Sequence, residues 1–74
     1  MKTKPFILKG KCEYGDFTIS VVRGDGQYIK HEATASCFVF GKEYKETVYD
    51  DDINVVTRKA GETLIKKLKS EFGI

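Results

Sequence analysis

The sequence predicts an α+β fold: a four-stranded antiparallel meander, with its strands in chain order and one C-terminal helix packed on one face. Two observations lead to this prediction. Glycine-containing turns divide residues 6–49 into four runs rich in β-branched and aromatic residues. Only the segment that follows, about residues 54–72, repeats its apolar residues with the period of a helix. Because short turns join neighbouring antiparallel strands, the strands should pair in the order of the chain.

The four predicted strands are bounded by turn residues. We expect them at about residues 6–14, 17–23, 28–40 and 43–49. Gly15-Asp16 and Gly41-Lys42 suit two-residue hairpin loops, and a leading glycine such as Gly41 favours a type II′ turn. A three-residue loop from Asp25 to Gln27 is expected between the middle strands, because this length keeps lysine and glutamate off the buried face.

Alternation along these strands separates an apolar face from a polar one. The apolar face is expected to carry Leu8, Cys12, Tyr14, Phe17, Ile19, Val21, Ala33, Ala35, Cys37 and Val39. In this register Cys12 and Cys37 lie on strands that are not neighbours, so both should be free thiols. The helix is expected to cover this face.

The predicted helix has an apolar stripe, a charged back and residues suited to both of its ends. The stripe comprises Ala60, Leu64, Ile65, Leu68 and Phe72. Asp50 to Asp52 precede the helix, where carboxylate oxygens cap free N–H groups and negative charge stabilises the helix N-terminus. Gly73 follows it, where a residue in the left-handed conformation commonly ends a helix.

Gly61 lies at the centre of the apolar stripe, where a glycine costs about 1 kcal/mol relative to alanine. We expect Ala60 and Gly61 to let the helix axis approach Ala33 and Ala35 closely. The alternative is that the helix simply tolerates this glycine.

Composition argues against several classes of protein. The chain has 74 residues and is expected to form a single domain, 1–74, with a small core. Its hydrophobic content of 41% argues against disorder, and its net charge of +2 is small for a dedicated nucleic-acid-binding domain. No apolar run approaches the roughly 18 residues of a membrane span, and no signal-type segment follows the first residues. We therefore expect a cytoplasmic protein without a membrane partner.

The residues capable of catalysis or metal binding form no recognisable motif. His31 is the only histidine, and no serine, cysteine or acid is placed by motif to complete a triad with it. Asp50 to Asp52 are consecutive, so their side chains cannot all converge on one cation. Gly24-Asp25-Gly26 lacks the later glycine and the helix of a phosphate-binding loop. We expect no enzyme activity, cofactor, metal site or small-molecule substrate.

One face of the sheet has nothing in the sequence to cover it. A helix of about 10 Å diameter covers only one side of a sheet about 14 Å across. Phe38 and Phe40 are expected on the other side, where exposed aromatic rings need an explanation. The candidate partner-binding residues of this face are Phe38, Phe40, Lys45, Tyr49, Lys9 and Lys11.

Three interpretations of these aromatic residues are open. In the first, the aromatic residues form an interface for a protein partner or a second copy of the chain. In the second, these residues and the neighbouring lysines form a stacking platform for single-stranded nucleic acid. In the third, the third strand bulges and swaps its faces, so that Phe38 or Phe40 belongs to the core.

The first interpretation is favoured: a small non-catalytic binding protein that acts by protein–protein contact. It would work as a homodimer, or as an adaptor or inhibitor of a larger partner, in the style of phage and mobile-element accessory proteins. The alternative is a nucleic-acid-binding module that uses the outer sheet face or the helix lysines.

The order of four strands and a C-terminal helix resembles two known topologies. These are the sheet-and-helix half of double-stranded-RNA-binding domains and the strand-and-helix DNA-binding domains of phage-type integrases. The resemblance is one of topology and carries no residue motif. The leading helix of the RNA-binding domain is absent, and three aspartates, Asp50 to Asp52, precede the start of the last helix, where that domain has a lysine cluster. It therefore implies no functional residues for this chain.

Overall fold

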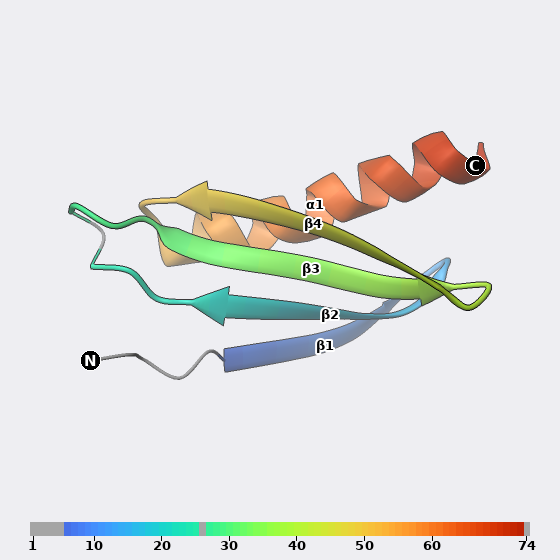
Figure 1. The fold of residues 1–74 in the computed structure, drawn as a ribbon, viewed down its shortest axis with the longest axis horizontal. Helices are drawn as coiled ribbons and strands as arrows, with labels where there is room; N and C mark the ends of the chain where they lie inside the picture. Colours follow the sequence, from blue (N-terminus) through green and yellow to red (C-terminus); the bar gives the residue numbers. More distant parts are fainter. Residues whose placement is uncertain (1–5, 26, 74) are drawn as a thin grey trace.

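The computed structural model describes residues 6–25 and 27–73 of the chain. Its elements are β1 (Phe6–Cys12), β2 (Gly15–Val22), β3 (His31–Val39), β4 (Lys42–Asp50) and α1 (Ile53–Phe72) (Figure 1). Neighbouring strands are antiparallel and lie in the order β1-β2-β3-β4, with α1 packed on one face of the sheet. The predicted α+β meander is confirmed.

The β1–β2 hairpin turns earlier along the chain than predicted. Cys12 pairs with Gly15, which makes Glu13 and Tyr14 the loop in place of Gly15-Asp16. Cys12 therefore faces Gly15 and not Ile19. The register differs by an even number of residues, and an even shift leaves each side chain on its predicted face.

The β3–β4 hairpin also turns earlier than predicted. Phe40 and Gly41 form its loop, with φ angles of 52° and 79°. Positive φ at both central residues is typical of a type I′ turn, so the predicted type II′ turn at Gly41-Lys42 is wrong. Val39 pairs with Lys42, and Phe40 lies in the turn rather than on the open face of the sheet.

The connection between β2 and β3 is longer than the predicted three-residue loop. β2 ends at Val22 and β3 begins at His31, so a third strand starting at residue 28 is wrong. The Asp25 carboxylate accepts hydrogen bonds of 2.8 to 2.9 Å from the backbone N–H groups of residues 27–29. These bonds stabilise a compact turn where strand pairing was expected.

The core lies between α1 and the inner face of the sheet. Its buried residues are Ile19, Val21, Ala33, Ala35, Cys37, Val39, Tyr44, Val56, Ala60, Leu64 and Leu68. Val39 is buried whereas its neighbours Phe38 and Phe40 are exposed, so β3 keeps its predicted faces and the bulge interpretation is wrong. Cys12 and Cys37 are free thiols, and burial raises the pKa of the Cys37 thiol.

The helix begins and ends at the predicted caps. The Asp52 carboxylate accepts hydrogen bonds from the N–H groups of Asn54 and Val55, at 2.8 and 3.2 Å. Gly73 adopts the left-handed conformation, with φ of 69°, and donates its N–H to the Lys69 carbonyl. Among the described residues, no helix combines the length and the apolar character that crossing a bilayer requires.

The small residues under the helix do not all have the predicted role. Ala33, Ala35 and Ala60 are fully buried in the core shared by helix and sheet. A Cβ atom added at Gly61 would meet only Ile19 Cδ1, at 3.5 Å, which is an ordinary van der Waals distance. The expectation that Gly61 itself permits a close approach is therefore wrong.

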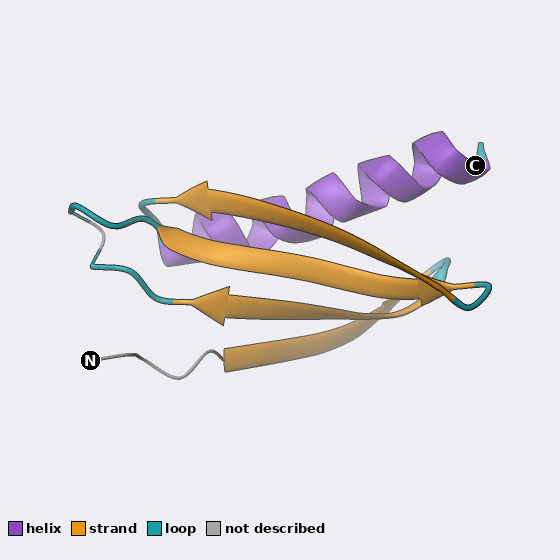
Figure 2. Ribbon diagram, viewed as in Figure 1, coloured by secondary structure: helices purple, strands orange, loops and turns teal. Residues whose placement is uncertain are grey.

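The helix covers only part of the inner face. It packs on β4 and β3, approaches β2 less closely and does not reach β1, which lies at the far edge (Figure 2). As a result Leu8 is 44% exposed and Phe6 is 40% exposed, although Leu8 pairs with the buried Ile19. Leu8 lies on the predicted face, but the prediction that the helix covers this face is wrong at Leu8.

Candidate protein interface

The β1–β2 loop, the β3–β4 loop and the C-terminal end of α1 lie at the same end of the sheet (Figure 1). Aromatic rings gather there. Phe72 is the central ring, with the ring centroids of Tyr14, Phe40 and Tyr44 at 5.7 to 6.0 Å from its own. Such separations are typical of favourable aromatic pairs. We call Tyr14, Phe38, Phe40 and Phe72 the aromatic tip.

A hollow of about 420 Å³ lies in the aromatic tip, lined by Glu13, Tyr14, Phe38, Val39, Phe40 and Phe72. The Tyr14 hydroxyl oxygen is shielded from solvent and has no hydrogen-bond partner among the described residues. Loss of solvation, followed by the negative charge of Glu13, raises the pKa of Tyr14. This hydroxyl is therefore an unsatisfied polar group, shielded beneath the surface of the aromatic tip.

Phe40 is the most exposed large apolar side chain among residues 6–25 and 27–73, at 93%. Its φ of 52° lies in the left-handed region, which glycine and asparagine adopt far more readily than phenylalanine. Folding therefore gains little from this ring and bears a backbone cost. Residues of this kind are concentrated at functional positions.

Phe38 of the aromatic tip and Lys45 lie together on the outer face of the sheet. Phe38 is 64% exposed and pairs with Glu43 of β4. Lys45 lies two residues further along β4, which makes it a diagonal neighbour of Phe38. Lys45 forms an exposed ion pair of 3.7 Å with Glu43, a contact that contributes little to stability.

The other predicted partner-binding residues lie elsewhere. The hydroxyl of Tyr49 donates a 3.1 Å hydrogen bond to Glu32, and this bond raises the pKa of Tyr49. Along β3, Glu32 is about 20 Å from Phe38. Lys9 and Lys11 are exposed on β1, at the edge of the sheet. The fold therefore brings Phe38, Phe40 and Lys45 to one end, with Lys9 in the same row as Lys45 but three strands away, and it leaves Tyr49 far along β4.

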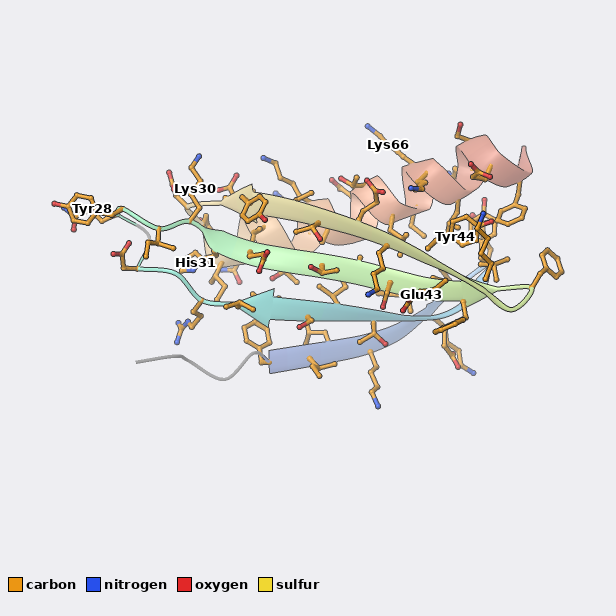
Figure 3. The ribbon with its side chains drawn as sticks, viewed as in Figure 1. Tyr28, Lys30, His31, Glu43, Tyr44 and Lys66 are labelled. Carbon is orange, nitrogen blue, oxygen red and sulfur yellow. The ribbon has the colours of Figure 1, made fainter. Side chains whose placement is uncertain are left out.

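Two exposed apolar residues were missed by the sequence reasoning. Tyr28 and Ile29 are 84% and 64% exposed in the β2–β3 connection. Figure 3 shows Tyr28 at the end of the sheet opposite Tyr44. The sequence places both residues in the third predicted strand, because tyrosine and isoleucine are typical strand residues. The opposing signal is Asp25, since an aspartate shortly before such residues favours a turn capped by its side chain.

The aspartates before α1 have structural contacts. Asp50 accepts a hydrogen bond from the N–H of Asp52 and forms an ion pair of 3.0 Å with Lys59. These contacts lower the pKa of Asp50. In the part of the chain that the structure describes, no three side chains of His, Cys, Asp or Glu are placed to hold a metal ion.

Comparison with protein-family models, with curated proteins and with solved structures finds no match to this chain. Function is therefore inferred from exposure, geometry and charge.

Proposed function

We propose that this protein is a small non-catalytic binding protein that acts by protein–protein contact through the aromatic tip. The observation that carries this proposal is Phe40, which is 93% exposed in a backbone conformation unfavourable to phenylalanine. Aromatic side chains that become buried on association supply much of the affinity of protein interfaces. The partner is a second copy of the chain or a larger protein.

The surroundings of Phe40 suit it to binding. Phe72 lies on the last turn of α1 and packs against the buried Tyr44, so the ring beside Phe40 is held by the core. A preformed surface loses little conformational entropy when a partner binds. The adjoining hollow offers space to a partner side chain.

The test compares Phe40→Asn with the wild type. Asn-Gly is the preferred sequence of a type I′ turn, so this variant should be folded and at least as stable. We expect self-association, measured by size-exclusion chromatography with light scattering, or capture of a partner to weaken by about tenfold or more, which corresponds to about 1.4 kcal/mol. Tyr28→Asn, which removes an exposed ring at the opposite end of the sheet, is the matched control and should bind as the wild type does.

The proposal fails if the wild type stays monomeric at high concentration and Phe40→Asn captures the same proteins equally well. It also fails if Tyr28→Asn weakens binding as much as Phe40→Asn does.

A second candidate function, nucleic-acid binding, is supported by one row of residues across the outer face. Lys9 pairs with Thr18, Thr18 with Ser36, and Ser36 with Lys45, while the exposed Phe38 lies beside this row. Lysines, hydroxyls and an exposed ring together suit a single strand of nucleic acid. Random-sequence oligonucleotides should then bind in low salt and dissociate as salt rises, and absence of binding in low salt would remove this candidate.

A further inference from the structure

The two edges of the sheet are built differently. On β4, Glu46 and Asp50 lie on the inner face and form ion pairs of 3.1 and 3.0 Å with Lys67 and Lys59 of α1. Inward-pointing charges and a covering helix are common protections of an edge strand against pairing with another chain. Among the described residues β1 has neither: α1 does not reach it (Figure 1), and its own inner residues are apolar.

The inner side of β1 is apolar and partly bare. A Cβ atom added at Gly10 would come within 2.7 Å of the Phe17 ring, so this ring lies over the glycine. A depression of about 460 Å³ opens on the outer side, because four of its lining residues, Lys9, Lys11, Asp16 and Thr18, lie on the outer face; Gly10 and Phe17 complete the lining. On the inner side Phe6 and Leu8 are about half exposed, so an apolar side chain of an added strand would find apolar contacts there.

The outer side of β1 is positively charged. Lys9 and Lys11 are exposed, and among the described residues no carboxylate lies within ion-pair distance of either. The strand itself, FILKGKC, contains no acidic residue. Fully aligned antiparallel pairing of β1 with a second copy of itself would place Lys9 opposite Lys9, and like charges on adjacent strands are unfavourable. The same lysines favour an acidic strand.

We propose that β1 receives an extended segment of a protein partner as a fifth strand, and that this segment alternates acidic with apolar residues. Successive side chains of a strand point to opposite faces, so the acidic ones would lie beside Lys9 and Lys11. The apolar ones would lie beside Leu8 and Phe17. Backbone hydrogen bonds at the free edge supply affinity, and the alternating contacts supply specificity. This surface is separate from the aromatic tip and does not depend on it.

The test uses capped peptides of about eight residues, a little longer than a typical strand. In one peptide valine alternates with glutamate, and in the matched peptide valine alternates with lysine. With the isotope-labelled full chain, the glutamate peptide should shift the amide resonances of residues 6–12 and slow their hydrogen exchange. The lysine peptide should do neither at the same concentration.

Charge reversal makes the test specific. In a chain carrying both Lys9→Glu and Lys11→Glu, the glutamate peptide should bind about tenfold more weakly or worse, and the lysine peptide should now bind β1. Lys45→Glu, on the same outer face but on β4, is the matched control and should leave glutamate-peptide binding unchanged. If circular dichroism shows that the doubly reversed chain is unfolded, the salt dependence of the wild type is the test instead. The affinity of the wild type for the glutamate peptide should then fall as salt rises.

Several results would overturn the proposal: equal binding of the two peptides, shifts confined to residues outside β1, or affinity unchanged by charge reversal or by salt. Occupation of β1 by an oligonucleotide, or by a second copy of the chain in the absence of peptide, would also overturn it. A chain that binds its partner through Phe40 yet ignores the glutamate peptide refutes only the fifth strand. A chain that binds the peptide at β1 and is insensitive to Phe40→Asn refutes only the aromatic tip.

Discussion

At the scale of single residues, Gly24 and Gly61 have different structural requirements. A Cβ atom at Gly24 would lie 2.3 Å from the carbonyl oxygen of Ile29, and backbone atoms there cannot easily move aside. A Cβ atom at Gly61 would meet only the flexible end of Ile19, at 3.5 Å. Gly24 is therefore needed for the β2–β3 connection to close, whereas Gly61 is a replaceable helix residue.

Gly61→Ala should stabilise the protein by about 0.5 to 1 kcal/mol, because alanine is the better helix former and the site has room for its methyl group. Urea denaturation followed by circular dichroism measures this difference. Gly24→Ala should instead destabilise the protein. A loss of stability in Gly61→Ala would mean that the helix needs the glycine for a close approach after all.

The carboxylate of Asp25 makes the β2–β3 connection sensitive to acid. Hydrogen bonds from the backbone N–H groups of Ile29, Tyr28 and Gln27 lower the pKa of Asp25. Since the folded pKa lies below that of the unfolded chain, the carboxylate stabilises the turn above the ordinary Asp pKa. This contribution is lost as pH falls through the lowered folded pKa.

We therefore expect the amides of residues 27–29 to exchange faster with solvent as the pH falls through the lowered pKa of Asp25. This increase should exceed the change in intrinsic exchange rate and should precede any loss of protection in α1. Hydrogen exchange followed by nuclear magnetic resonance measures it. In Asp25→Ala the same amides should be poorly protected at every pH. Acid-independent protection of these amides in the wild type would contradict the role given to Asp25.

At the scale of elements, α1 depends on one of the aspartates that precede it. Asp52 accepts two backbone hydrogen bonds as the N-cap residue, whereas the neighbouring Asp51 side chain forms none among the described residues. Removing a cap oxygen leaves helix N–H groups without a protein acceptor.

Asp52→Ala should lower the free energy of unfolding by about 1 kcal/mol. Asp51→Ala is the matched control, with the same change of charge one position away, and should alter stability by only a few tenths of a kcal/mol. Denaturant titration at neutral pH measures both. Equal losses in the two variants would show that helix-dipole charge, and not the hydrogen bonds of Asp52, stabilises the helix start.

At the scale of the whole molecule, the position of α1 divides the sheet into a covered part and an open part. Leu64 is 1% exposed between helix and sheet, while Leu8 on β1 is 44% exposed. Truncation of a buried leucine removes contacts and leaves a cavity, but truncation of a half-exposed one mainly removes partly hydrated surface.

Leu64→Ala should cost about 2 to 5 kcal/mol, enough to unfold much of a domain of this size. Leu8→Ala should cost less than about 1 kcal/mol. Urea denaturation at low protein concentration compares them, and hydrogen exchange should show β1 as the least protected strand. A large loss in Leu8→Ala would mean that another surface covers β1 in solution.

By itself the sequence determined the order of the elements, the helix caps and the face on which each strand residue lies. Each strand residue lies on its predicted face despite the errors in register, because side chains alternate with a period of two and each register differs from the predicted one by an even number of residues. Only the tertiary structure decided where the hairpins turn, which half of the sheet α1 covers and that Phe40 leaves the open face. These features depend on contacts between segments far apart in the chain, such as Phe72 with Tyr44 and Lys67 with Glu46. Local patterns of polarity do not encode such contacts, so the bare side of β1 and the aromatic tip emerge only when the helix is in place.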